Sequence, residues 1–71
     1  MHYTVILERE DEGGYHAFAP ALKGCHSQGE TLEEAVGNIT EAIGLYLESL
    51  KAHGEAAPTE DILIKPIEVA A

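Results

Sequence analysis

Four histidines and one cysteine are the side chains of this 71-residue sequence that could bind a metal ion or act as nucleophile and base. His2 and His16 would oppose one another if the first two predicted strands pair. Cys25 and His26 are adjacent in a third strand, so they point to opposite faces and cannot share a metal ion or form a nucleophilic pair. Cys-x-x-Cys and His-x-x-x-His spacings are absent. We therefore expect no metal and no cofactor, and Cys25 is predicted to be a small apolar side chain.

Three glutamates, Glu8, Glu34 and Glu68, are candidates for a magnesium-dependent nuclease site built on a β-β-β-α-β sheet. Such a site needs acids from the central strand, the helix and the last strand to converge at one end of the sheet. Glu8 ends the first predicted strand, whereas Glu34 lies at the start of the predicted helix, where its carboxylate has a capping role. We expect no catalytic residue and a protein that is not an enzyme.

The polar side of the predicted helix combines acidic and small residues. Glutamates recur every seven residues at Glu34, Glu41 and Glu48, beside the small residues Gly37, Thr40 and Gly44. Glycine inside a helix costs about 1 kcal/mol relative to alanine, so two of them need a reason. One interpretation is that this face is solvated and tolerates glycine. The other is that a partner approaches it closely, and Leu45, an apolar residue outside the main apolar stripe of the helix, favours this second interpretation. The candidate partner-binding residues are Glu34, Gly37, Glu41, Gly44, Leu45 and Glu48.

The helix that carries these residues is predicted over residues 32–52. Thr31 and Glu34 have the spacing of a capping box, in which the hydroxyl accepts from a free backbone N–H and the carboxylate reaches back to the N–H of the capping residue. Apolar residues then recur with helical spacing for five turns, and Gly54 supplies the stop.

Alternating apolar residues predict strands at 1–8, 15–19 and 25–29, with charged residues and two glycines forming the turn between the first two. A last strand is predicted at 62–69, where the alternation changes phase at Pro66, as at a bulge or a sheet edge. The order β-β-β-α-β predicts a single two-layer α+β domain over residues 1–71. The helix covers one sheet face, and a right-handed crossover returns the last strand parallel to the first and third.

The predicted helix is longer than the strands beneath it. Its 21 residues span about 30 Å, whereas strands of five to eight residues span about 17–26 Å. The C-terminal turns, which carry Tyr46, Leu47 and Leu50, should overhang the sheet and remain partly uncovered. This overhang, together with a core short of large side chains, predicts association with a second subunit.

Charge narrows the possible partners. Thirteen acids against four bases give a formal net charge of −9, and so few cations cannot form the basic footprint that binds nucleic acid or an anionic membrane surface. A basic partner is the natural complement. No apolar run approaches the ~20 residues of a membrane span, and the N-terminus lacks the features of a signal peptide, so we expect a cytoplasmic protein.

Two motifs resemble those of the HicB family. Residues 14–25, GYHAFAPALKGC, are similar to its G-Y-x-A-x-x-P-x-L-x-G-C signature. Residues 27–39, SQGETLEEAVGNI, are similar to its x-Q-G-x-T-x-x-E-A-x-x-N-I motif, and the resemblance extends over residues 3–69. Within these motifs, residues with structural reasons to be present are Gly14, Pro20, Gly24, Gly29 and Thr31.

The resemblance implies an antitoxin with a degraded RNase H-like sheet that occludes the active site of a small basic ribonuclease toxin, HicA, which degrades mRNA. It also implies assembly into dimers or tetramers. Members of the family usually carry an additional DNA-binding domain, and these 71 residues contain no such segment, so direct operator binding by this chain is not expected. The alternative is an orphan oligomeric module that binds another protein and has no toxin partner.

Overall fold

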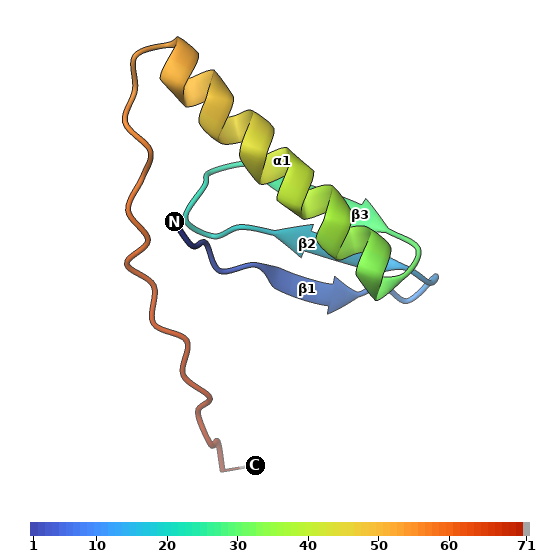
Figure 1. Ribbon diagram of the computed structural model, residues 1–71. Coiled ribbons are helices and arrows are strands. Elements are labelled where there is room, and N and C mark those ends of the chain that lie inside the picture. The colour runs from blue at the N-terminus through green and yellow to red at the C-terminus, as the bar shows by residue number, and fades with distance from the viewer. Residues whose placement is uncertain (71) are drawn as a thin grey trace.

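Three short strands form one antiparallel sheet in the computed structural model, which describes residues 1–70. The strands are β1 (Ile6–Arg9), β2 (Tyr15–Phe18) and β3 (His26–Gly29), in the spatial order β1-β2-β3 (Figure 1). All three predicted strands are confirmed, although β1 begins at Ile6 rather than at residue 1. The first and third strands run in the same direction, as predicted for a meander.

The hairpin between β1 and β2 is closed by the two glycines that the sequence places there. Glu10 donates its N–H to the carbonyl oxygen of Gly14 at 3.0 Å, and Gly13 donates to Glu10 at 3.1 Å. Gly13 and Gly14 have φ angles of 100° and 86°, a left-handed backbone that glycine adopts readily. The turn sets a register in which Glu8 lies opposite His16, so the predicted pairing of His2 with His16 is wrong.

The helix α1 (Leu32–Ala52) has the predicted bounds. The Thr31 hydroxyl accepts a hydrogen bond from the Glu34 N–H at 3.1 Å, which confirms the capping residue. The predicted hydrogen bond from the Thr31 N–H to the Glu34 carboxylate is not formed. The Glu34 carboxylate accepts instead from the N–H of Glu30 at 3.2 Å. One residue of displacement still leaves this carboxylate at the positive end of the helix, where a negative charge is favourable.

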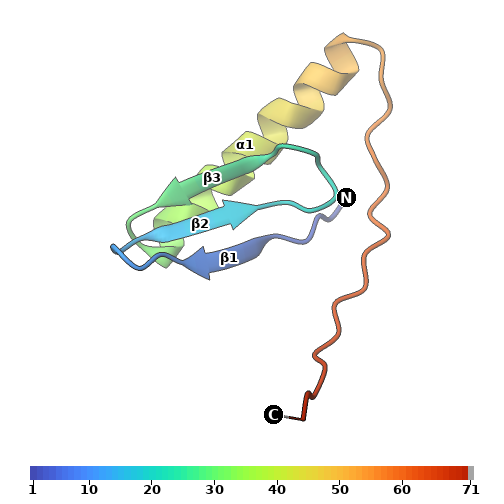
Figure 2. The same ribbon diagram turned by 180° about the vertical axis from the view of Figure 1, so that it is seen from behind.

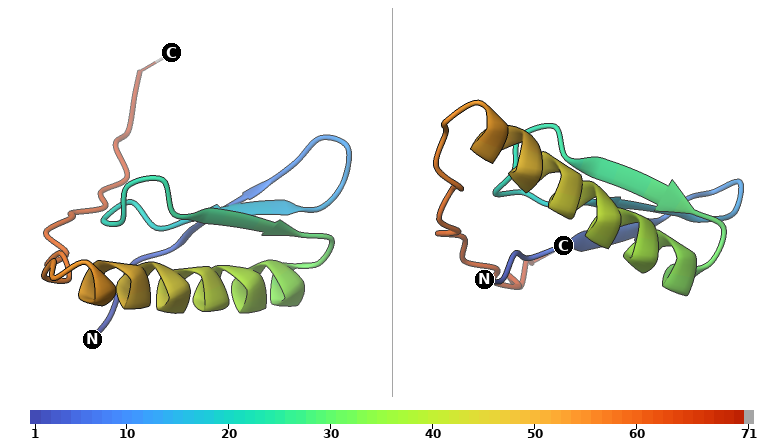
Figure 3. Two further views of the ribbon diagram at one scale, coloured as in Figure 1. Left: turned by 90° about the horizontal axis from the view of Figure 1, so that it is seen from above. Right: turned by 45° about the horizontal axis from the view of Figure 1, so that its top comes forward.

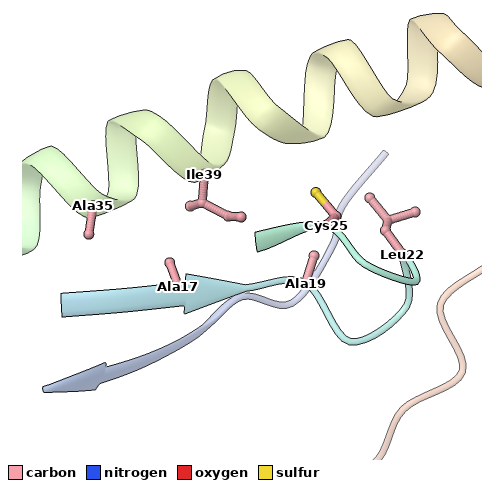
Figure 4. Packing of buried hydrophobic residues seen from close by; sticks show 6 residues of the cluster. All are labelled: Ala17, Ala19, Leu22, Cys25, Ala35 and Ile39. Carbon is pink, nitrogen blue, oxygen red and sulfur yellow. The ribbon is translucent and has the colours of Figure 1, made fainter. Parts of the chain in front are cut away.

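Six buried residues form the core between the sheet and α1 (Figure 4). They come from β2 and the segment after it, from the residue before β3 and from the helix: Ala17, Ala19, Leu22, Cys25, Ala35 and Ile39. Three of the six are alanines, which allows the helix to approach the sheet closely. Tyr46, Leu47 and Leu50 are only half-buried, and the C-terminal turns of α1 extend past the ends of the strands (Figure 3, left), confirming the predicted overhang.

The helix lies over β3 and β2 more than over β1. Its first turn approaches β3 so closely that a Cβ atom at Gly29 would lie 2.5 Å from the backbone nitrogen of Ala35. One turn later, the Asn38 side chain donates to the carbonyl oxygen of Gln28 in β3 at 2.8 Å. These contacts fix the helix along one edge of the sheet.

Residues 55–70 form neither a helix nor a strand, so the strand predicted at 62–69 is wrong for this chain. The segment is attached to the N-terminal residues instead. The Tyr3 hydroxyl donates to the carbonyl oxygen of Pro58 at 2.6 Å, and both the N–H and the hydroxyl of Thr4 donate to the Glu60 carboxylate. Beyond Glu60 the chain runs away from the sheet (Figure 1), so its alternating residues have no neighbouring strand.

Acid is expected to release the attachment at Glu60. Hydrogen bonds from the side chain and then the backbone of Thr4 hold the pKa of Glu60 below its ordinary value. Because the folded-state pKa is lowered, the stabilisation is present above the unfolded-state pKa and is lost as the pH falls through the lowered value. The amide resonance of Thr4, followed by NMR from about pH 7 to about pH 2, should titrate across the carboxyl range.

Glu60→Gln is the control for this titration, since it keeps the shape of the side chain and removes the ionisable group. The Thr4 amide should then show no transition in the acid range. A transition of equal size in Glu60→Gln would contradict the role of this carboxylate.

Candidate partner-binding surface

The six candidate partner-binding residues share the side of α1 that faces away from the sheet, called here the outer helix face. Its members are Glu34, Gly37, Glu41, Gly44, Leu45 and Glu48, and all are exposed. The opposite side of the same turns carries the buried Ala35 and Ile39. The helix therefore presents this set as one continuous strip on the outside of the two-layer domain.

Nothing within the chain explains the two glycines of the strip. A Cβ atom added at Gly37 or at Gly44 would meet no atom within 4 Å, so neither glycine is required by internal packing. The neighbouring Thr40 hydroxyl donates to the carbonyl oxygen of Val36 at 2.7 Å and so lies against its own helix. The middle of the outer helix face therefore has no protruding side chain at the two glycines, whereas the adjacent Leu45 side chain is 60% exposed.

Within residues 1–70, none of the three glutamates on the outer helix face has a cation beside it. In this described part of the chain, the only basic and acidic side chains within 4 Å of each other are His16 and Glu8, at 3.6 Å. Glu41 and Glu48 therefore face solvent without a cationic partner, whereas the Glu34 carboxylate accepts from the N–H of Glu30 at the helix start. A surface of this kind can attract a cationic partner, and its small residues allow close contact once the partner arrives.

A second surface, which the sequence analysis missed, lies on the sheet face away from the helix (Figure 2). The rings of His16 and Phe18 stack with centroids 5.8 Å apart, and the rings of His16 and His26 lie 5.5 Å apart. Beside them is an open hollow of about 490 Å³, whose lining also includes Pro20 and Leu22. The spacing of His16 and Phe18, two residues apart in one strand, was the available signal, because such residues share a face.

The metal and nucleophile candidates are not brought together. Cys25 is 6% exposed and points into the core (Figure 4), whereas its neighbour His26 is exposed, which confirms that the two residues face apart. Burial raises the pKa of the Cys25 thiol, so the reactive thiolate is disfavoured. Cys25 is the small apolar core residue that the sequence predicted.

The candidate nuclease acids also lie apart. Glu8 faces His16 across the hairpin, Glu34 is at the helix start, and Glu68 is in the segment that leaves the sheet. Within residues 1–70, no three histidine, cysteine or acidic side chains are grouped so that they could hold a metal ion.

The five structural motif residues have roles in the scaffold. Gly14 and Gly24 have positive φ angles, Pro20 starts the loop after β2, and Thr31 caps α1. Gly29 is the point where the helix touches the sheet. The same motifs also supply all six buried residues of the core. The motifs therefore specify how the domain folds.

Comparison with known proteins places this scaffold in a family. The family described as "HicB_like antitoxin of bacterial toxin-antitoxin system" matches residues 3–68. The chain belongs to this HicB-like antitoxin family. Membership indicates a toxin–antitoxin role.

Relatives of this HicB-like chain occur in bacteria and archaea. A UPF0150 protein of Synechocystis is 62% identical over 96% of this chain and 86% of its own length. A UPF0150 protein of Helicobacter pylori is 49% identical over 99% of this chain and 97% of its own length. A UPF0150 protein of Thermoplasma acidophilum is 49% identical over 86% of this chain and 88% of its own length. Within residues 1–70, no helix is both long enough and apolar enough to cross a membrane.

Proposed function

We propose that this chain is a non-enzymatic antitoxin module that binds a basic, HicA-type mRNA-degrading ribonuclease and occludes its active site. The observation that carries the proposal is the outer helix face, where Glu41 and Glu48 have no cationic partner and Gly37 and Gly44 leave open space. A ribonuclease that binds RNA presents cations to the phosphates of its substrate. An acidic helix face matches the same cations and competes with the RNA.

The net charge supports the proposal at longer range. A chain of formal charge −9 is attracted to a basic protein before any contact forms, which raises the association rate and makes it sensitive to salt. The same charge repels RNA, so the antitoxin would bind the enzyme and not its substrate. This complementarity suits a cytoplasmic complex whose target acts on mRNA.

The sheet and helix also fit the expected ancestry. The β-β-β-α order is the part of a degraded RNase H-like domain that this chain would retain, without a converged set of catalytic acids. Assembly into a dimer or tetramer belongs to the same proposal, because the uncovered turns of α1 and the exposed apolar residues after Glu60 both need cover.

Co-expression with any small basic protein encoded next to this chain tests the proposal. We expect the basic protein alone to arrest growth, and growth to recover when this chain is supplied. The two proteins should purify together at low salt. Absence of both rescue and co-purification would overturn the antitoxin role.

A second candidate function is an orphan oligomeric module that binds a protein other than a toxin. The exposed apolar residues after Glu60 favour it, because they predict assembly without requiring a toxin. The two functions differ in one observation: the orphan module would have no small basic open reading frame adjoining its gene.

A further inference from the structure

The segment of residues 61–69, called here the C-terminal arm, exposes apolar side chains to an unusual degree. Leu63 is 95% exposed, Val69 77%, Ile67 70% and Ile64 68%. Burying four large aliphatic side chains is favourable, so we expect another surface to cover them in the stable assembly. The arm is extended and runs away from the sheet (Figures 1 and 3), so its own domain leaves these four side chains uncovered.

The domain offers one open sheet edge. In an antiparallel pair, every second residue of a strand bonds to its partner strand, and the residues between them direct their N–H and C=O groups outward. Glu10 bonds to Gly14 at the end of the hairpin, so the residues of β1 that direct these groups away from β2 are Leu7 and Arg9. Within residues 1–70 no strand lies on that side of β1. Unpaired edges of this kind readily accept another strand.

The opposite edge of the sheet, at β3, is partly engaged by the helix. By the same alternation, the carbonyl group of Gln28 points outward from β3, and it accepts the hydrogen bond from Asn38 of the helix. The helix packs along β3 more closely than along the rest of the sheet. An added strand would therefore find more free main-chain groups along β1 than along β3.

The inner face next to the open edge is also incompletely covered. Tyr3, Val5 and Leu7 pack against the core but remain half-exposed, because α1 lies over β3 and β2. A strand alongside β1 with apolar side chains on that face would extend the core beneath them. The arm provides a mostly apolar face of this kind, since Leu63, Ile67 and Val69 share one side of an extended chain with a single charged residue, Lys65.

The arm of the same chain is not placed to fill this edge. The bonds from Tyr3 to Pro58 and from Thr4 to Glu60 hold the chain across the beginning of β1. From that crossing the arm continues away from β1, not along it (Figure 1). A second copy presents the same open edge and the same uncovered arm.

We propose that the C-terminal arm of one copy pairs with the open edge of β1 in a second copy, and that the exchange is reciprocal. Each chain then donates one arm and accepts one, so the assembly closes as a two-fold dimer with no donor or acceptor left over. Pro66 lacks an N–H and cannot donate to a neighbouring strand, so the edge of the arm that includes Pro66 faces solvent. The arm bonds to β1 through its other edge, where Leu63, Lys65 and Ile67 direct their N–H and C=O groups. The arm becomes the outermost strand of the partner's sheet.

This arm exchange does not depend on the toxin. Both copies carry a formal charge of −9, so their association is opposed by repulsion and should strengthen as salt is added. A complex with a basic toxin should weaken with salt. The two associations can therefore be separated in one titration, and the failure of one leaves the other standing.

The decisive variant is Leu63→Gln with Ile67→Gln, measured by light scattering after gel filtration and by sedimentation. These side chains are mostly exposed in the single chain, so their loss should leave the circular dichroism spectrum unchanged. We expect the wild type to be a dimer at micromolar concentration and the variant to raise the dimer dissociation constant about 100-fold or more. Leu45→Gln, which removes an exposed leucine from the outer helix face, is the control and should remain dimeric.

Cross-linking tests the exchange where the variant fails to fold. In a Cys25→Ala background, chains carrying only Glu8→Cys are mixed with chains carrying only Glu68→Cys, whose side chains share the outer face in the proposed pairing, and treated with a short bismaleimide. Cross-linked hetero-dimers are expected, because the arm of one chain lies beside β1 of the other. Glu41→Cys in place of Glu8→Cys is the control and should cross-link weakly. A monomeric wild type, or equal cross-linking in both mixtures, would overturn the exchange.

Discussion

Gly29→Ala is expected to lower the free energy of unfolding by about 3 kcal/mol, a large effect for a change of one methyl group. The new Cβ atom would lie 2.5 Å from the backbone nitrogen of Ala35 and 2.8 Å from the carbonyl carbon of Glu34. These are backbone atoms of the first helical turn, so no side chain can rotate to make room. The helix start must move away from β3, and the contacts of the adjacent Ala35 with the core are loosened.

Gly37→Ala is the matched control for this substitution. It adds the same methyl group inside α1, at a position where a Cβ atom meets nothing within 4 Å. Alanine is the better helix former by about 1 kcal/mol, so this variant should be more stable than the wild type. Urea unfolding of all three proteins at one protein concentration gives the comparison, since association also changes the observed stability. If Gly29→Ala were as stable as the wild type, the close approach of helix and strand would be contradicted.

Local sequence signals predicted most of this domain. The bounds of α1 follow from Thr31, the apolar repeat and Gly54, all of which act within one or two turns. The hairpin follows from Gly13 and Gly14, whose positive φ angles the turn requires. These features depend on neighbours in the sequence, so the sequence alone determines them.

The error at residues 62–69 has a different origin. Alternating apolar residues indicate that a segment can form a strand, but a strand also needs an edge to pair with. The attachment of Glu60 to Thr4 determines where the arm is directed, and no local pattern predicts that contact. The alternation of the arm is then consistent with a strand completed by another chain.

The candidate surface was likewise only partly predictable. Helical spacing was sufficient to place Glu41, Gly44 and Glu48 on one face, because that geometry is local. The cluster of His16 and His26 depends on the register between β2 and β3, and the bond from Asn38 to Gln28 depends on how the helix lies on the sheet. Both arise from tertiary arrangement, for which a single sequence gives weak signals.

Glu41→Lys combined with Glu48→Lys is expected to slow association with the basic ribonuclease about tenfold or more at low salt. Each substitution changes the charge by two, so the net charge goes from −9 to −5, and two cations then face the cations of the partner. The salt dependence of the association rate should fall as well, because attraction between the two faces is what salt screens. Stopped-flow mixing over a range of salt concentrations measures both effects.

Glu10→Lys combined with Glu12→Lys separates the location of the charge from its amount. These two glutamates are exposed in the hairpin turn, and the double variant has the same net charge of −5. If the outer helix face is the contact surface, the turn variant should lose only the modest part of the rate that comes from long-range attraction. Equal slowing in both variants would assign the effect to net charge, and an unchanged rate in the helix variant would remove this face from the interface. Because Glu41 and Glu48 form no ion pair within residues 1–70, neither outcome is confounded by loss of an internal contact.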